Sequence, residues 1–472
     1  MTMIIGWMLW PKLLILMAKN VAIIGGGIAG LTAAYYLKKS GITPTVFEAS
    51  SQLGGVIQSD TIDGFTIENG PNTLLLSDQR TVEMFDDLGL QFEDASPNSK
   101  NRYVVKDKQL VAVPMSIKSF ITTSLFSWTS KFKIITEAFR QNKPLGDEES
   151  VSQFIIRRFG KEVLVYAVNP FIAGTYAGDP DSLSIEHSFP LLENTERVYG
   201  SVIGGFFKNR KKQNPHKIKR RTISFPKGVA ELTHALSNYL SDSTHLNTTI
   251  SDISKTDNSF TLTNTQNGKM ESSSFDEIIC TVPTYSLKNI TINGEDYPDF
   301  DELGEINYPP VISISLGYKK EHIPHSLEGF GALVPKCENM NILGVLFSSS
   351  LFNNRAPKDH SLLTVFIGGS RQPELTVLSE IERVQLAKED LETLLGISTE
   401  PAFMHQTLWK KAIPQYHVGY GHYKSIMNMI EAKLRGFHFA GNYVNGISIQ
   451  DTILSSMNLV NELNRHSSTC SE

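Results

Sequence analysis

Three glycines near the start of the chain have the spacing of a turn that binds phosphate. Gly25, Gly27 and Gly30 form a GxGxxG pattern between an apolar run at 21–24 and an alanine-rich helical pattern at 31–41. The first glycine permits a tight turn, the second lets the backbone approach a pyrophosphate, and the third lets the helix pack close to the strand. The free N–H groups at the start of that helix favour the same anion. We therefore expect a pyrophosphate at Gly25, Gly26, Gly27, Ile28, Ala29 and Gly30.

An acidic residue follows at the distance that a dinucleotide site requires. The second predicted strand, TPTVFEAS at 43–50, places Glu48 where a carboxylate accepts hydrogen bonds from a ribose diol. Strand, glycine turn, helix, strand and acid thus occur in the order of a dinucleotide-binding unit. They predict an α/β fold whose first strand lies buried in a parallel sheet.

The elements that position these residues belong to a long chain of ordinary composition. With 472 residues, 40% hydrophobic and 20% charged, the chain is expected to form two or three domains. Its formal net charge of -5 provides no cationic field for a phosphate backbone, which argues against a nucleic-acid partner. The three cysteines lack the spacing of metal ligands, and they are not an even set that could form the disulfides of a secreted fold. We therefore expect the protein to lie in a reducing cytoplasm.

A second glycine turn occurs near the C-terminus, in GNYVNGISIQDTILSS at 441–456. It follows a predicted strand at 437–440 and leads into a helix that should begin near Ile449 or Gln450. Asp451 is favourable in the first turn of this helix, because a carboxylate complements the positive end of the helix dipole.

Residues 1–16 are apolar but lack the basic start and the small-residue cleavage site of a signal peptide. A proline and a lysine also interrupt the apolar run. We expect this segment to be an extension, with the working protein starting at Met17.

The segment after Glu48 resembles the extended FAD-binding signature of flavin oxidases. Gly54 and Gly55 form a second flexible turn, and residues 70–73 follow a hairpin-like stretch. In that signature the two segments lie along the ribityl chain and the flavin, so the resemblance implies FAD and not NAD. In glutathione-reductase-like flavoproteins the late helix also points its N-terminus at the flavin. The implied FAD contacts beyond the first turn and Glu48 are Gly55, Val56, Gly70, Pro71, Asn72, Thr73, Ile250, Trp409, Ile447, Ser448 and Ile449.

Longer motifs extend the resemblance to nearly the whole chain from Met17. AGDPDSLS at 177–184, SSSLFNNRAP at 348–357 and IPQYHVGY at 413–420 are similar to segments of the porphyrinogen oxidases. These are the FAD enzymes of haem synthesis, protoporphyrinogen oxidase and coproporphyrinogen III oxidase. The resemblance implies a six-electron oxidation of the porphyrinogen to the porphyrin, with three oxygen molecules consumed and three hydrogen peroxides released.

The resemblance also implies a substrate site. A porphyrinogen is a large, mostly apolar macrocycle with carboxylates on one side, so its pocket should be apolar with a few cations. The apolar residues that would line this pocket and hold the ring against the flavin are Leu333, Leu346 and Phe366. Arg102 would hold a propionate, and Gly178 would leave room where the substrate approaches. No catalytic side chain and no metal are expected, because the flavin accepts the hydride and passes electrons to oxygen.

The domain organisation follows from these motifs. We expect a discontinuous, glutathione-reductase-like FAD-binding domain at 18–95, 222–285 and 410–472, a mixed-sheet substrate domain at 286–409 and a helical insertion at 96–221, in an amine-oxidase-like architecture. Residues 116–141 mix apolar and basic residues at helical spacing. This helix either packs on its own domain or contacts a membrane surface or a partner such as ferrochelatase. The protein would be cytoplasmic or peripheral on the inner face of the cell membrane.

Two other functions fit the same fold. An FAD-dependent amine oxidase shares the architecture, but its closing motif generally has an acid at the position of Asn442 and lacks GISIQD. A non-enzymatic binding protein of this fold would not need an intact GxGxxG with its acid. The sequence leaves open the choice between protoporphyrinogen IX and coproporphyrinogen III, the oligomeric state and membrane attachment.

Overall fold

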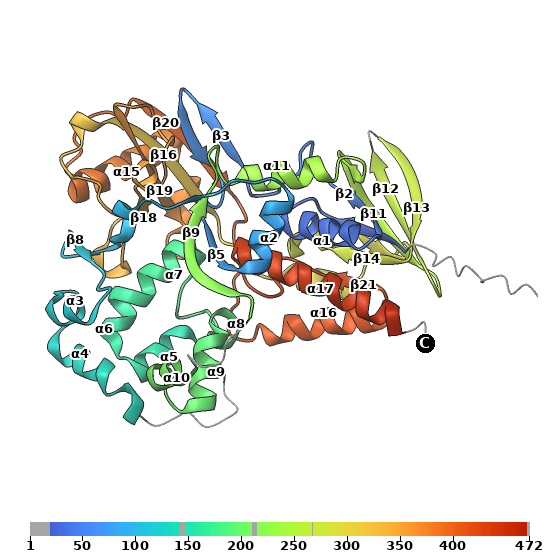
Figure 1. Cartoon of the computed structure of the whole chain (residues 1–472), viewed down its shortest axis with the longest axis horizontal. Helices are drawn as coiled ribbons and strands as arrows, with labels where there is room; N and C mark the ends of the chain where they lie inside the picture. The colour runs from blue at the N-terminus through green and yellow to red at the C-terminus, as the bar shows by residue number, and fades with distance from the viewer. Residues whose placement is uncertain (1–18, 141–147, 210–214, 267, 470–472) are drawn as a thin grey trace, which may run out of the picture.

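The computed structural model describes residues 19–140, 148–209, 215–266 and 268–469. The predicted extension at 1–16 lies outside the described residues. Figure 1 shows three bodies of structure: a parallel sheet with its helices at the right, a second large sheet at the upper left, and a group of helices at the lower left.

A five-stranded parallel sheet forms the first body. Side chains alternate between the two faces of its strand β1, so Val21 and Ile23 pack in one apolar core while Ala22 and Ile24 pack in a second. Helices α1, α11 and α17 cover the first core, and α16 covers the second. This arrangement confirms the predicted α/β fold. The strands lie in the order β10-β2-β1-β14-β21, with β1 at Asn20–Ile24, β2 at Thr43–Phe47, β10 at Thr244–His245, β14 at Glu277–Cys280 and β21 at Phe437–Phe439; the helices are α1 (Ile28–Lys39), α11 (Ala230–Tyr239), α16 (Gly421–Lys433) and α17 (Ile449–Thr469).

Two smaller sheets extend this body, and the β3–β4 pair packs on the second body, where Phe65 and Ile67 lie in an apolar cluster with Leu362 and Phe403. One of the two sheets has the order β13-β12-β11-β15, and the other has the order β5-β9-β6 and is followed along the chain from β5 by helix α2. Their bounds are β3 (Ser59–Ile62), β4 (Phe65–Glu68), β5 (Leu74–Asp78), α2 (Gln79–Asp87), β6 (Glu93–Asp94), β9 (Lys217–Ser224), β11 (Thr248–Lys255), β12 (Phe260–Gln266), β13 (Lys269–Phe275) and β15 (Thr291–Ile292).

A seven-stranded mixed sheet forms the second body. One of its faces is apolar: Ile312 and Ile314 of β16 and Val365 of β19 pack with Leu391 of helix α15. Strand β4 covers part of the opposite face, where Phe65 and Ile67 pack with Leu362 and Phe403. The strand order is β20-β16-β19-β18-β17-β7-β8, with bounds β7 (Tyr103–Lys106), β8 (Gln109–Ala112), β16 (Val311–Lys319), β17 (Gly331–Leu333), β18 (Ile342–Leu346), β19 (His360–Gly368) and β20 (Phe403–Trp409); α14 (Ser348–Leu351) and α15 (Glu380–Leu395) belong to the same body.

The observed boundaries differ from the expected ones at two places. Strands β7 and β8 fall within 96–221, yet they form the edge of the seven-stranded sheet because β7 pairs in parallel with β17. Leu287 and Phe300 fall within 286–409, yet they pack in the second core of the first body with Phe437. In both cases apolar side chains and strand pairing join segments that a division along the chain separates.

The third body is helical. Among the residues that the structure describes, no helix is both long enough and apolar enough to cross a membrane. The main helices of the third body are α3 (Ile117–Thr122), α4 (Trp128–Ile135), the 3₁₀ helix η2 (Glu137–Phe139), α5 (Val151–Arg158), α7 (Asn169–Tyr176), α8 (Ile185–Ser188), α9 (Pro190–Tyr199) and α10 (Val202–Asn209).

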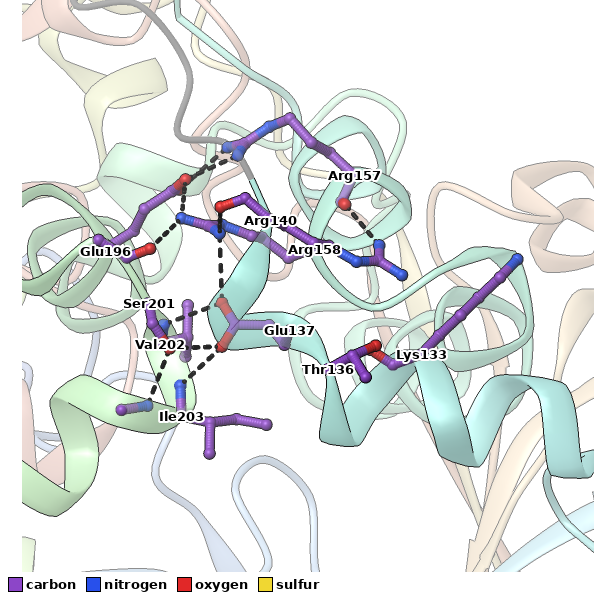
Figure 2. A network of polar contacts seen from close by, with 12 residues as sticks. Lys133, Thr136, Glu137, Arg140, Arg157, Arg158, Glu196, Ser201, Val202 and Ile203 are labelled. Carbon is purple, nitrogen blue, oxygen red and sulfur yellow. Dashed lines mark hydrogen bonds and ion pairs between the residues drawn. The ribbon is translucent and has the colours of Figure 1, made fainter.

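A buried charged network holds these helices together (Figure 2). The guanidinium of Arg158 is fully buried and lies 2.5 Å from Glu196 and 3.4 Å from Glu137. Glu137 in turn accepts hydrogen bonds from Ser201 Oγ at 2.7 Å and from Val202 N at 3.0 Å, at the start of α10. These partners offset the cost of burying the charges, and they join α5, α9, α10 and η2.

Candidate functional site

The first glycine turn leaves one side of its backbone open. Gly25 has a φ of +108°, and its N–H donates to Phe47 O at 2.8 Å, which fixes the turn beside β2. A Cβ on Gly30 would lie only 2.0 Å from Gly25 O, so α1 packs directly on the turn. A Cβ on Gly27 would meet no atom within 4 Å. The backbone at 27–29 therefore presents the first N–H groups of α1, which have no partner within the helix, to open space.

Glu48 lies at the rim of this turn. It directly follows β2, and its Oε2 accepts a hydrogen bond from Gly26 N at 2.7 Å. Its Oε1 accepts one from Ser50 N at 2.8 Å. Two backbone donors thus fix the carboxylate beside the first glycine turn. The remaining lone pairs of the carboxylate can accept hydrogen bonds from a ribose diol.

The second predicted segment packs on the first. A Cβ on Gly55 would lie 3.2 Å from Gly27 Cα. A Cβ on Gly70 would lie 1.9 Å from Val56 O, so a larger residue would push these two backbone segments apart. The structure therefore brings three of the predicted cofactor-binding segments together in one place.

Asn69 anchors the turn at 70–73, which we call the flavin turn after the contact that the sequence resemblance implies. Its Oδ1 accepts a hydrogen bond from Thr407 Oγ1 at 2.7 Å and lies 3.1 Å from His405 Nε2. Trp409 Nε1 donates to Asn69 O at 2.6 Å. These three partners alternate along β20, so one face of that strand holds the turn at three points. Sequence reasoning singled out Trp409 but missed Asn69, whose only signal is its position directly before Gly-Pro.

Two tyrosines hold the second glycine turn. Tyr416 OH donates to Asn442 O and accepts a hydrogen bond from Gly446 N at 3.0 Å. Tyr420 OH donates to Tyr443 O at 2.7 Å. Burial raises the pKa of Tyr416 and Tyr420 far above the ordinary value, so both phenols stay protonated and can donate. Sequence reasoning did not assign these tyrosines a role.

Helix α17 begins at Ile449 directly after this turn, as predicted from the sequence. Ser448 caps it by accepting a hydrogen bond from Asp451 N at 3.1 Å, and Ile447 packs partly buried against the second core. The first N–H groups of the helix carry the positive end of its dipole. Ile250 is 4% exposed and lies in the second core, so its predicted contact with FAD stays a prediction.

Three side chains are unusual on the face of the large sheet opposite α15. Along β17, β18 and β19 almost every residue is buried, but Leu333, Leu346 and Phe366 are partly exposed, as is the terminal His360. Leu333 lies opposite Gly344, and Gly344 lies opposite Phe366. Leu346 occupies the next pair along the same face. We call these three residues the apolar wall.

The apolar wall shares its face with the residues that hold the flavin turn. Phe366 lies opposite Ser313, and Ser313 lies opposite Thr407, which bonds Asn69. Residues directly opposite one another in an antiparallel sheet project to the same face. The wall therefore faces the side of the sheet on which the flavin turn lies.

Arg102 and Gly178 have different surroundings. Arg102 is exposed just before β7, and its guanidinium lies 5.0 Å from the ring centroid of Phe330, which leaves its charge available to a carboxylate. Gly178 is buried, and a Cβ there would lie 2.4 Å from Gln415 Oε1. A side chain at 178 would therefore collide with Gln415 before it projected into open space.

Taken together, these residues fit an FAD. The open backbone at Gly27 and the start of α1 suit the pyrophosphate, Glu48 suits the ribose, and the flavin turn lies where the parallel sheet meets the large sheet. The capped N-terminus of α17 adds a partial positive charge in the same domain.

Comparison with known proteins identifies the family. Residues 28–464 match the family of flavin containing amine oxidoreductases. Protoporphyrinogen oxidase 2 of Arabidopsis thaliana is 35% identical over 96% of this chain and 95% of its own length. Coproporphyrinogen III oxidase of Bacillus subtilis is 26% identical over 92% of this chain and 96% of its own length. The chain belongs to the porphyrinogen oxidase family.

Solved structures share the fold of this porphyrinogen oxidase family member. A protein from Exiguobacterium sp. 255-15, described as a protoporphyrinogen oxidase, has a TM-score of 0.77 at 22% identity and covers 95% of this chain and 99% of its own. Reduced UDP-galactopyranose mutase has a TM-score of 0.72 at 16% identity over 95% of this chain and 94% of its own. The chain is an FAD-dependent oxidoreductase, and the predicted amine-oxidase-like architecture is confirmed.

Proposed function

We propose that this protein oxidises a porphyrinogen to the porphyrin, with molecular oxygen as the acceptor and hydrogen peroxide as the second product. The observation that supports this most strongly is the apolar wall, formed by the three partly exposed residues on otherwise buried strands. An apolar surface of this kind suits a large, mostly apolar macrocycle. Arg102 supplies an exposed cation for a propionate.

The chain's own residues bind and orient the ring. When bound, FAD supplies hydride acceptance and electron transfer to oxygen. Leu333 and Phe366 hold the macrocycle against the side of the sheet that carries the flavin turn, and Arg102 fixes its carboxylate edge. Removal of six hydrogens in three two-electron oxidations consumes three oxygen molecules and yields three hydrogen peroxides. We place all three hydride removals at one meso carbon, with imine–enamine shifts inside the ring returning hydrogen to that carbon from the other meso carbons. Every meso CH2 group loses one hydrogen overall, so the test is the primary isotope effect on flavin reduction: an effect from deuterium at more than one meso carbon would contradict this proposal.

Protoporphyrinogen IX is the substrate we propose. The protoporphyrinogen oxidases among the relatives reach 35% and 37% identity, whereas the coproporphyrinogen III oxidases reach 26% and 28%. Coproporphyrinogen III carries propionates where protoporphyrinogen IX carries vinyl groups, so its pocket needs further cations.

The test offers both porphyrinogens, prepared anaerobically, to the purified yellow protein and records porphyrin fluorescence and peroxide yield. Phe366→Asp places a charge on the apolar wall, so it should raise the KM strongly and leave the FAD content unchanged. Met404→Asp, at a 55% exposed position of β20, is the matched control and should have the KM of the wild type. A protein that retains FAD but forms no porphyrin from either substrate would rule out the proposed function.

We also propose that the insertion lies on a lipid surface. Helices α3 and α4 and the segment η2 expose large apolar side chains in succession, beside the exposed lysines Lys118 and Lys133. Exposed aromatic and aliphatic residues with basic neighbours suit an interfacial helix on anionic lipid. The exposed apolar residues are Met115, Ile117, Ile121, Trp128, Phe132, Ile135 and Phe139.

Flotation with vesicles of phosphatidylglycerol and phosphatidylcholine tests this surface. The double variant Phe132→Asp and Ile135→Asp should lose vesicle binding, while Val377→Asp, at a still more exposed position outside the insertion, should retain it. Equal vesicle binding by the wild type and the double variant would exclude the lipid proposal and favour a protein partner such as ferrochelatase for this surface.

A further inference from the structure

Arg355 is a buried cation that the predicted site does not include. It lies in the SSSLFNNRAP segment after α14 and is 2% exposed. Its Nη2 donates to Ser224 Oγ at 2.6 Å and to Phe225 O at 3.2 Å, and lies 3.6 Å from Glu68 Oε1. Its Nη1 has no hydrogen-bond partner among the residues that the structure describes.

Glu68 connects this cation to the flavin turn. It is the last residue of β4, directly before Asn69, and is 5% exposed. Its Oε1 accepts a hydrogen bond from Val229 N at 3.0 Å, and its Oε2 accepts one from Ser59 Oγ. The strand that leads into the flavin turn therefore ends in a carboxylate whose surroundings are fixed on several sides.

The backbone makes the same connection. Thr66 N donates to Arg355 O at 3.1 Å, and Thr66 Oγ1 donates to Asn354 O at 3.1 Å. Strand β4 is thus bound through both its side chains and its backbone to a loop of the large sheet. A shift of this loop would move the start of the flavin turn.

A small polar cavity lies at this junction. Asn72 of the flavin turn contributes to one wall, and Thr364, which pairs with Leu346 of the apolar wall, contributes to another. Arg355 also lines this cavity. Its guanidinium is therefore next to both the turn that we assign to the flavin and the face that we assign to the substrate.

We propose that Arg355 is a positioning residue: its guanidinium and backbone hold the flavin turn at a fixed distance from the apolar wall. This inference rests on the proposed place of the flavin at residues 70–73. Arginine suits the task because its planar fork can bind the hydroxyl of Ser224, the carbonyl of Phe225 and the carboxylate of Glu68 at once, which a lysine ammonium cannot do in the same geometry.

A merely structural role is the competing explanation, and Arg158 provides the matched control. Arg158 is also fully buried and paired with carboxylates, but it lies in the helical insertion (Figure 2). Removing either guanidinium takes a cationic partner away from a buried carboxylate and should lower the melting temperature. Only the removal of Arg355 should change how the protein holds FAD.

The experiment measures the FAD dissociation constant of the apoproteins and the flavin absorption spectrum of the reconstituted proteins. Arg355→Met should raise the dissociation constant about tenfold or more and alter the resolved vibrational structure of the flavin band. Arg158→Met should leave the dissociation constant within about twofold of the wild type. Equal FAD affinities and spectra for Arg355→Met and wild type, or equal losses for the two variants, would overturn the proposal.

Arg355→Lys keeps the test decisive if the methionine variant does not fold. It retains the charge and loses the fork, so its FAD dissociation constant should lie clearly above that of the wild type. A lysine variant with a lowered melting temperature and unchanged FAD affinity would overturn the proposal. Because these readouts need no porphyrinogen, a protein that binds FAD but oxidises no porphyrinogen would contradict the proposed function and leave this inference standing.

Discussion

The first glycine turn allows a sharp test, because two of its glycines are required for different physical reasons. Gly27 has a φ of -76°, which alanine adopts freely, and a Cβ there would meet no protein atom within 4 Å. Gly27→Ala should therefore change the stability of the apoprotein by less than about 1 kcal/mol. The methyl group would occupy the space assigned to the pyrophosphate, at a cost of about 1–3 kcal/mol, which weakens FAD binding roughly 5-fold to 150-fold.

Gly30→Ala should have the opposite signature. Its Cβ would lie 2.0 Å from Gly25 O and 3.0 Å from Ile23 Cγ2. The closest atom is backbone, so the clash can be relieved only by moving α1 away from β1. We expect the apoprotein to lose about 3 kcal/mol or more of stability, at the upper end of the cost of overpacking.

The assay combines two measurements on protein from which FAD has been removed. Thermal unfolding reports the stability of the apoprotein, and titration with FAD, followed by quenching of flavin fluorescence, reports affinity. Gly27→Ala should have the melting temperature of the wild-type apoprotein and a lower affinity for FAD. Gly30→Ala should have a lower melting temperature than the wild-type apoprotein. If Gly27→Ala lowered the melting temperature of the apoprotein as much as Gly30→Ala does, the assignment of open space at Gly27 to a phosphate would be refuted.

Three further predictions concern polar contacts. Glu137→Leu leaves Arg158 with one carboxylate fewer and should cost about 3–5 kcal/mol, seen as a lowered melting temperature; an unchanged value would contradict the network. Burial raises the pKa of Glu68 to about 7, so the folded protein binds more protons than the unfolded chain between about pH 5 and pH 7. The stability of the wild type should therefore fall by up to about 3 kcal/mol as the pH rises through that window, and Glu68→Gln should remove this slope in urea titrations. Trp409→Phe loses the 2.6 Å hydrogen bond to Asn69 O, worth about 1 kcal/mol, and should raise the FAD dissociation constant about fivefold; equal affinities would show that the bond does not hold the flavin turn.

The cofactor half of the site could be predicted from the sequence because its signals are local. Gly25, Gly27 and Gly30 lie within a single turn, and Glu48 follows one helix and one strand later, so spacing alone indicates the chemistry. The predicted start of α17 near Ile449 was likewise confirmed, since helix starts depend on a few neighbouring residues. Helix α1 begins at Ile28, three residues before the helical pattern at 31–41.

The residues that hold the site in place could not be predicted in this way. Asn69 bonds Thr407, a residue 338 positions away, and Arg355 lies 3.6 Å from Glu68 although 287 positions separate the two in the chain. No period or motif in a single chain indicates such pairs. The boundaries failed for the same reason, because the pairing of β7 with β17 depends on the assembled sheet.

The two halves of the site also differ in what determines their geometry. On the cofactor side, backbone topology decides: Gly25, Glu48 and Gly441 all follow the carboxyl ends of parallel strands, and Thr281 Oγ1, after β14, donates to Gly25 O at 2.9 Å. The carboxyl ends of parallel strands meet at one edge of the sheet, so these groups lie close together there. Their placement depends on the sheet having formed and not on which apolar side chains its strands carry. On the substrate side, the register of the paired strands determines the geometry. A shift of the pairing by one residue would turn the side chains of the apolar wall to the other face of the sheet. Asn69 and its partners on β20 connect the two, which is why we expect substitutions there to affect FAD and substrate together.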